Sequence, residues 1–336
     1  MSARTAKPTR AAPPPGTGRL PPWASGAADR FNRIASSKVA RTVVTIGILA
    51  IAAVLIRGEL KSANLADVGH AIASTPLWAI GACATCTVAT YLCEAAVEWY
   101  VLRYIGKPLP LRRTVLAASA SSALSIAMGF GLASGTAARL RFYAFADLSA
   151  ADVAKITGLV SAAVFLTGLM VLGLSGLGGE AVIGKVLHWP PWGVIALSIG
   201  LLLLVPAWFL ALNRWSGHDA EAIGVRDRAF CLAAGLGNWI FQGAAMFVLS
   251  AHTAAALPGF LAAFCLGSLV GSAIGVPADL GVLEATVLGS HTLGAAHQGA
   301  AALVLYRVIF QLIPMSMATV AVFGRQALQL ARRSSR

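Results

Sequence analysis

Apolar residues in this chain gather in long runs that short polar connections separate. Eight runs dominate, and a shorter one lies at 281–293. The main runs are 42–56, 77–102, 114–132, 153–177, 192–212, 229–250, 258–276 and 298–324. A helix needs about 20 mostly apolar residues to cross the hydrocarbon core of a bilayer. The pattern therefore predicts an all-α polytopic integral membrane protein with about eight apolar helical segments.

Composition and charge support this class. The 336 residues are 57% hydrophobic and only 12% charged, whereas a soluble domain carries about 25% charged residues. The net charge is +13, and the basic residues lie in the N-terminal tail and between the apolar runs. Such a distribution is typical of cytoplasmic loops that face an anionic membrane surface. We expect that surface as a partner and no nucleic acid, because the chain lacks a basic surface interleaved with aromatic residues.

The distribution of prolines and charges divides the chain into three regions. Residues 1–37 contain six of the 15 prolines and scattered arginines, a composition that cannot bury a hydrophobic core. We expect a disordered, basic, proline-rich cytoplasmic tail there. Residues 38–326 form the predicted helical membrane domain, and 327–336 form a second basic cytoplasmic tail.

The positions of Lys and Arg discriminate between two topologies. If all eight main runs cross the membrane, 17 basic residues lie on the cytoplasmic side and 8 lie outside. If 114–132 enters and returns, and 258–293 forms a second hairpin from the opposite face, the counts become 22 and 3. The second topology is favoured because cytoplasmic loops carry an excess of basic residues. Two broken, re-entrant hairpins in inverted orientation are typical of transporters whose site lies between discontinuous helices.

The stretch 129–143 combines flexible backbone with fixed positive charge. Three glycines interrupt an apolar sequence, and Arg139, Arg141 and Tyr143 follow them. Irregular backbone at membrane depth is tolerated only where it is buried in protein or lines a wet cavity. We therefore expect this stretch to form half of a polar site of lipid-headgroup size.

A second broken region lies between the runs 258–276 and 281–293. Pro277 and Gly281 end one helix and start another, Asp279 can cap the new helix, and Glu284 lies in its first turn. A carboxylate is stabilised at that end of a helix, so a well-capped helix start explains the pattern. A role in binding a substrate or an ion explains it as well.

Two carboxylates lie within the run 77–102. Glu94 and Glu98 are four residues apart and therefore share one face of a helix. Because ionised groups facing lipid are very costly, they must face the bundle interior, water or a cationic partner. Glu98 is near the helix end, where Arg103 or Arg41 could pair with it.

An arginine lies well inside the last run. Arg307 follows Tyr306, and its candidate partners are Glu284, Asp279 or Glu94. An arginine inside a membrane helix marks a functional site or a buried ion pair that sets helix register. Further along the same run, Pro314 should kink the helix and free a backbone carbonyl.

The motifs of soluble enzymes are absent from the sequence. It contains no G-x-S-x-G, P-loop, H-E-x-x-H or G-x-G-x-x-G pattern, so ATP-driven transport within this chain is not expected. We expect no catalytic residue, no metal and no cofactor.

Four stretches in order resemble the transmembrane flippase half of the multiple peptide resistance factor family, the bifunctional aminoacyl-phosphatidylglycerol synthase/flippases. The wider group is the UPF0104, or lysylphosphatidylglycerol-synthase transmembrane, family. The stretches are 98–111 (EWYVLRYIGKPLPL), 129–143 (GFGLASGTAARLRFY), 277–284 (PADLGVLE) and 306–314 (YRVIFQLIP). Two departures stand out: members usually have glycine where this chain has Asp279, and often Ser-Gly-Gly at 134–136. The sequence ends at Arg336, so we do not expect the soluble aminoacyl-transferase domain that the bifunctional proteins carry after the membrane region.

The resemblance implies a lipid flippase of the bacterial inner membrane, linked to phosphatidylglycerol and to antimicrobial peptide resistance, with both termini cytoplasmic. It implies movement of an anionic or aminoacylated phospholipid between leaflets, without an ATPase or aminoacyl transfer. The substrate-binding residues would be Arg139, Arg141, Tyr143, Glu98, Asp279, Glu284, Tyr306 and Arg307. The alternative is a non-transporting membrane subunit that scaffolds a separate lipid-modifying enzyme.

Overall fold

The computed structural model describes most of the region between residues 70 and 320. The described residues are 70, 73–128, 136, 139–140, 142–143, 148–204, 206–207, 224–250, 256–275, 279–290 and 296–320. They all belong to one compact unit, Val43–Arg336. The predicted tails, the run 42–56 and Arg141 lie outside them.

Helices are the regular structure throughout this described part, which contains no strand. The elements are α4 (Leu77–Tyr104), α5 (Leu111–Met128), α7 (Ala150–Gly176), α8 (Glu180–Leu187), α9 (Pro191–Leu202), α11 (Val225–Phe247), α12 (Leu257–Ile274), α13 (Val282–Gly289), α14 (Ala296–Tyr306) and the π-helical turn η4 (Arg307–Leu312). Among the described residues, five helices are long and apolar enough to cross a membrane, or six if one bent pair counts as a single span. The prediction of an all-α polytopic membrane protein is confirmed.

The apolar runs located most of the long helices to within a few residues. The runs 77–102 and 153–177 correspond to α4 and α7, and 229–250 and 258–276 correspond to α11 and α12. Helix α5 corresponds to the run 114–132 but is not among the candidate spans. The turn of the first predicted hairpin, around 129–135, lies outside the described residues. Helices α12 and α13 of the second pack against each other.

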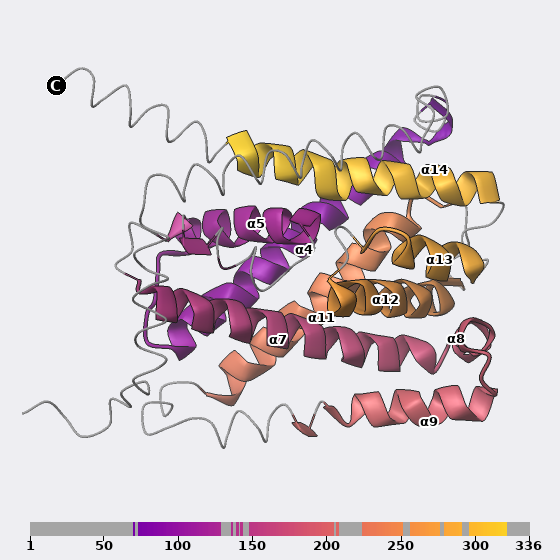
Figure 1. Ribbon diagram of the computed structural model, residues 1–336, viewed down its shortest axis with the longest axis horizontal. Helices are drawn as coiled ribbons and strands as arrows, with labels where there is room; N and C mark the ends of the chain where they lie inside the picture. Colours follow the sequence, from indigo (N-terminus) through magenta and orange to yellow (C-terminus); the bar gives the residue numbers. More distant parts are fainter. Residues whose placement is uncertain are drawn as a thin grey trace, which may run out of the picture. The chain divides into compact units, whose positions relative to one another are not determined.

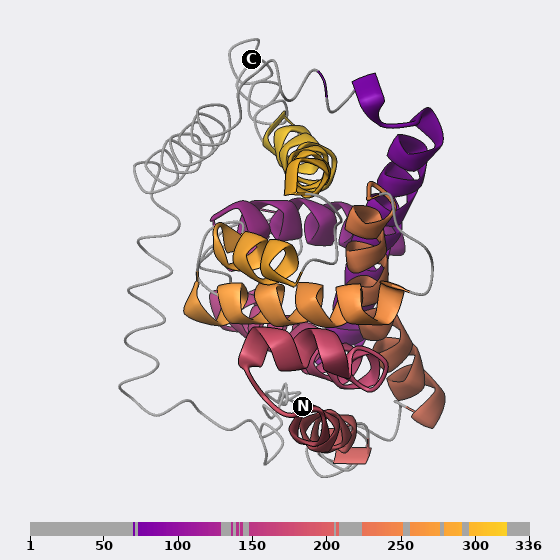
Figure 2. The same ribbon diagram turned by 90° about the vertical axis from the view of Figure 1, so that its right-hand side faces the viewer.

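Two sets of helices cross in this unit. Helices α4 and α11 lie side by side and cross α7, which packs against both (Figure 1). Helix α7 also contacts α12 and α9, which lie on opposite sides of it (Figure 2). Helix α12 in turn packs on α13, so that α7, α12 and α13 form consecutive neighbours. The interior between these helices holds the polar site described below.

Glycines let α7 and α11 approach closely at two adjacent points. A Cβ atom at Gly168 of α7 would lie 2.5 Å from the ring of Trp239 on α11. Conversely, a Cβ atom at Gly235 of α11 would lie 2.6 Å from Thr167 on α7. The indole N–H of Trp239 also donates a hydrogen bond of 2.7 Å to the carbonyl oxygen of Val164. Each helix therefore inserts a side chain beside a glycine of the other.

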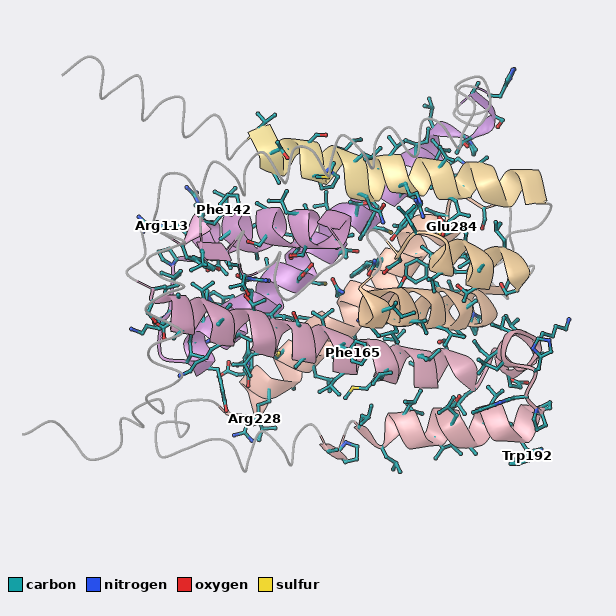
Figure 3. The ribbon with its side chains drawn as sticks, viewed as in Figure 1. Arg113, Phe142, Phe165, Trp192, Arg228 and Glu284 are labelled. Atoms are coloured by element: carbon teal, nitrogen blue, oxygen red, sulfur yellow. The ribbon has the colours of Figure 1, made fainter. Side chains whose placement is uncertain are left out.

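The connection between α8 and α9 bends the chain by 107°, which the apolar pattern did not predict. His188, the residue after α8, has a left-handed backbone with φ of 54°. Pro190 and Pro191 follow, and a proline disfavours helical conformation in the residue before it. Trp189 and Trp192 are exposed beside the bend, where amphipathic aromatic rings suit a membrane–water interface. Figure 3 shows Trp192 at the start of α9.

The last described helix changes its hydrogen-bonding pattern from α to π at Arg307. In an α-helix the residue at 314 would donate to the carbonyl of Phe310, but proline has no N–H group. The hydroxyl of Tyr91 on α4 donates to that carbonyl oxygen instead, at 3.2 Å. Tyr91 therefore ties η4 to α4 at the carbonyl that the sequence predicts to be free.

Candidate functional site

A polar cavity of about 810 Å³ lies among these helices. Helices α4, α5, α7, α11 and α12 and the π-helical turn η4 contribute to its wall, together with Arg139, Gly275 and Asp279 from the connections. Its polar and charged lining residues are Thr90, Glu94, Ser125, Arg139, Ser161, Asn238, Gln242, Ser268, Ser272 and Asp279. Apolar lining residues, among them Phe165, Trp239 and Phe310, complete it. We call this space the polar cavity.

Glu98 is the centre of a fully buried charged cluster beside the cavity. Its side chain on α4 has no exposed surface, and Arg139 and Tyr143 are 3% and 1% exposed. The Nε and Nη2 atoms of Arg139 donate to Glu98 Oε2 at 3.0 Å and 2.7 Å. The Tyr143 hydroxyl donates to the other carboxylate oxygen, Oε1, at 2.6 Å. Such charge-assisted hydrogen bonds compensate the charges that burial removes from water.

This geometry corrects the sequence-based position of Glu98. It does not lie at the interface with Arg103, because Arg103 forms an ion pair of 3.6 Å with Asp227 and covers the ring of Trp99. Arg139 is its partner, although 41 residues separate them in sequence. Arg139 also lines the polar cavity and interacts electrostatically with Glu94. Arg139, the described arginine of the polar site predicted at 129–143, therefore already interacts with carboxylates of the protein.

Arg307 pairs with Glu284, the first of its three candidate partners. Glu284 accepts a second hydrogen bond from the backbone N–H of Gly281, at 2.6 Å, which caps the start of α13. The carboxylate lies between α13 and the C-terminal helix (Figure 3). The Arg307 side chain is 4% exposed and that of Glu284 is 27% exposed. The Glu284 carboxylate therefore connects the start of α13 to the π-helical turn η4. It caps a helix and forms an ion pair with the buried Arg307, so both interpretations of the sequence apply to it.

Tyr306 precedes this arginine and is buried in an aromatic group. Its ring stacks on Phe310 with a centroid separation of 4.9 Å and meets Phe264 edge-on at 6.1 Å. Its hydroxyl lies 3.4 Å from the side-chain nitrogen of Gln242. Tyr306 also interacts electrostatically with Asp279. It therefore connects the aromatic core with the polar wall of the cavity.

Asp279 lies between α12 and α13 and faces the polar cavity. The hydroxyl of Ser272 is 3.4 Å from its Oδ1 atom, and Ser268 also interacts with the carboxylate. Its backbone is left-handed, with φ of 54°, a conformation that glycine adopts without strain. The glycine that the resemblance implies at this position would therefore fit the same backbone.

Two amides of α11 were missed by the sequence-based prediction. Asn238 and Gln242 line the cavity and are four residues apart, so they share one face of the helix. Asn238 is only 3% exposed, and its amide oxygen has no hydrogen-bond partner among the described residues. Their signal was present, because both interrupt the apolar run 229–250. Uncharged amides within an apolar run are less conspicuous than arginine or glutamate, so they were not selected as site residues.

The eight predicted site residues fall into three groups. Arg139 and Asp279 line the polar cavity. Five others are not among its described lining residues, although they pair with one another or with lining residues: Glu98, Tyr143, Glu284, Tyr306 and Arg307. Arg141 lies outside the described residues. The structure thus brings together two separate ion-paired clusters next to one cavity.

Comparison with known proteins finds relatives of similar length. The chain is 27% identical to the uncharacterized protein slr0712 of Synechocystis over 250 residues, covering 72% of this chain and 78% of that protein. It is 25% identical to the inner membrane protein YbhN of Escherichia coli over 248 residues, covering 69% of this chain and 76% of that protein. No family model matches the chain.

The name of YbhN places that protein in an inner membrane. Together with the apolar helices, it supports a multi-pass location in an inner membrane for this chain.

Proposed function

We propose that this protein is a membrane lipid flippase that moves an anionic or aminoacylated phospholipid between leaflets. In this proposal it acts as a transporter, not as an enzyme, and it does not hydrolyse ATP. The substrate is a phospholipid whose headgroup enters the protein while its acyl chains remain in the bilayer.

The polar cavity is the observation that carries this proposal. Ligand pockets for small molecules have volumes of about 300–1,000 Å³, and the cavity of about 810 Å³ lies within that range. Polar groups in the interior of a membrane protein are costly and mark pathways for polar substrates. Arg139 offers hydrogen-bond donors at the cavity wall, whereas Glu94 and Asp279 offer acceptors. A phospholipid headgroup is the membrane component that needs both.

Blocking the cavity tests the proposal. Gly158 of α7 lines the cavity, and a Cβ atom added there would meet nothing within 4 Å. Gly158→Trp should therefore place a large ring in the cavity without disturbing helix packing. The matched control is Gly200→Trp on α9, where an added Cβ atom also meets nothing within 4 Å and no cavity is lined.

The measurement is the movement of fluorescent phosphatidylglycerol between leaflets in liposomes that contain the purified protein. We expect wild type and Gly200→Trp to move the lipid, and Gly158→Trp to slow it by about tenfold or more, equal to about 1.4 kcal/mol in the barrier. Equal rates for the two variants would contradict the assignment of the cavity. If wild type moves no lipid and instead co-purifies with a lipid-modifying enzyme, the scaffold alternative replaces the proposal.

A further inference from the structure

The charges facing the polar cavity are dominated by carboxylates. Arg139, Glu94 and Asp279 line it, and Arg139 is already bound by Glu98 at 2.7 Å. Arg307, the other described arginine assigned to lipid phosphate, forms an ion pair with a carboxylate and is not among the lining residues. Both of these described arginines are therefore paired with carboxylates, whereas one lining carboxylate forms no recorded ion pair with a described residue.

That carboxylate is Asp279. None of the ion pairs recorded between described residues includes it. The groups recorded close to it are the hydroxyls of Ser272 and Ser268, which are neutral. Asp279 is partly exposed, and a carboxylate without a cation is costly inside a membrane protein. A cation that enters the cavity would remove this cost.

The backbone and packing hold the Asp279 carboxylate in position. A left-handed backbone costs a non-glycine residue about 1–2 kcal/mol, and Asp279 retains it with φ of 54°. Gly271 on α12 leaves room for the side chain, because a Cβ atom there would lie 2.6 Å from Asp279 Oδ1. Strained residues that persist in this way concentrate at functional sites.

A second acceptor on the cavity wall independently indicates a missing donor. Asn238 is 3% exposed, lines the cavity, and its amide oxygen accepts no hydrogen bond from the described residues. Buried polar atoms without a partner are rare, and each requires an explanation such as a bound ligand. A ligand group that donates hydrogen bonds and carries positive charge would satisfy both this oxygen and the carboxylate.

We infer that Asp279 and the amide oxygen of Asn238 form a cation subsite on the α11–α12 wall of the polar cavity. Its ligand is a monovalent cation, either the ammonium group of a lipid headgroup or a small free cation from solution. Where the source is a lipid, the inference rests on the proposed function and predicts that amine-bearing phospholipids bind more tightly than phosphatidylglycerol, which remains a substrate. Arg139, which is held by Glu98, then faces the phosphate side of the same headgroup.

Calorimetric titration of the detergent-purified protein tests the subsite. The probes are short-chain phosphatidylethanolamine, which has an ammonium group, short-chain phosphatidylglycerol, which lacks one, and ethylammonium chloride and sodium chloride at equal ionic strength. The variants are Asp279→Asn, which removes the charge and keeps the shape, and Asp279→Gly, which suits the left-handed backbone. Both should elute and unfold like wild type, so that a change in binding does not report misfolding.

We expect phosphatidylethanolamine to bind wild type more tightly than phosphatidylglycerol does. Both variants should weaken this binding by about 10- to 100-fold, as for the loss of a hydrogen bond to a charged group. If phosphatidylethanolamine has no advantage, but ethylammonium or sodium binds in an Asp279-dependent way, the subsite stands and its source is a free cation. Unchanged binding of every probe to both variants overturns the subsite. Failure of the liposome assay alone overturns the flippase proposal and leaves this result intact.

Discussion

The Glu98 cluster and the Asp279 region each contain a carboxylate beside or on the wall of the polar cavity, but Glu98 is fully buried whereas Asp279 is partly exposed. Glu98 has no exposed surface and receives donors on both oxygens, two from Arg139 and one from Tyr143. Asp279 faces the polar cavity, and its recorded neighbours are serine hydroxyls. The first carboxylate is satisfied by the protein, whereas the second retains capacity for a ligand. A buried charge therefore indicates a binding site only after its internal partners have been identified.

Removing Glu98 should have the largest effect. Glu98→Ala leaves Arg139 buried without its counter-charge, which typically destabilises a protein by about 3–5 kcal/mol. The expected result is loss of monodisperse protein in detergent, or a large fall in the unfolding temperature. Replacing both partners, as Glu98→Leu with Arg139→Met, should recover most of that loss because no charge is left unpaired. A double variant as unstable as the single one would show that the pair has a further role.

Removing one donor should have a smaller effect on the same cluster. Tyr143→Phe keeps the ring and deletes the hydroxyl that donates to Glu98 at 2.6 Å. A hydrogen bond to a charged group contributes about 1.5–3 kcal/mol, so the unfolding free energy should fall by that amount. Denaturant titration of the purified protein measures it. An unchanged midpoint would mean that another donor replaces the hydroxyl.

Crowding Asp279 should disturb the second region. In Gly271→Ala the new Cβ atom would lie 2.6 Å from Asp279 Oδ1 and 2.9 Å from its Cβ atom. Because overpacking typically costs about 1–3 kcal/mol, we expect destabilisation in this range. Gly289→Ala on α13 is the matched control, since its Cβ atom would meet nothing within 4 Å. Equal unfolding temperatures for the two variants would show that α12 and α13 are not packed as described.

Removing Asp279 itself should change stability least. Asp279→Gly relieves the strain of a left-handed backbone, which stabilises the folded state by about 1–2 kcal/mol. Glycine also gives the unfolded chain more conformational freedom, which lowers the unfolding free energy by about 0.5–1 kcal/mol. We expect an unfolding free energy within about 1 kcal/mol of wild type. A fall as large as that of Glu98→Ala would remove the distinction between the two regions.

The apolar runs were sufficient to locate the long helices. Buried apolar helices produce long apolar runs, so 77–102 predicted α4 (Leu77–Tyr104) and 258–276 predicted α12 (Leu257–Ile274). The short helix α8 and the bend before α9 were missed, because a run shows where apolar residues lie and not where the chain turns. The prolines at 190 and 191 were the sequence signal for the bend, because a proline disfavours helical conformation in the residue before it.

The ion-pair and hydrogen-bond partners of the site residues were harder to predict than the positions of the helices. The sequence named Glu284 as one of three candidate partners of Arg307, and the structure pairs these two residues. It missed the contact of Glu98 with Arg139, because that contact depends on how α4 packs against a segment 41 residues away. Asn238 was missed for another reason: an uncharged amide becomes informative only when its missing hydrogen-bond partner is seen.

The reciprocal glycine contacts between α7 and α11 limit how the protein can change shape. Trp239 lies against Gly168, and Thr167 lies against Gly235, so neither helix can slide along the other without a steric clash. We therefore expect these two helices to move together. In a transporter of the proposed kind, the surrounding helices would then supply the movement that opens the cavity to either side of the bilayer.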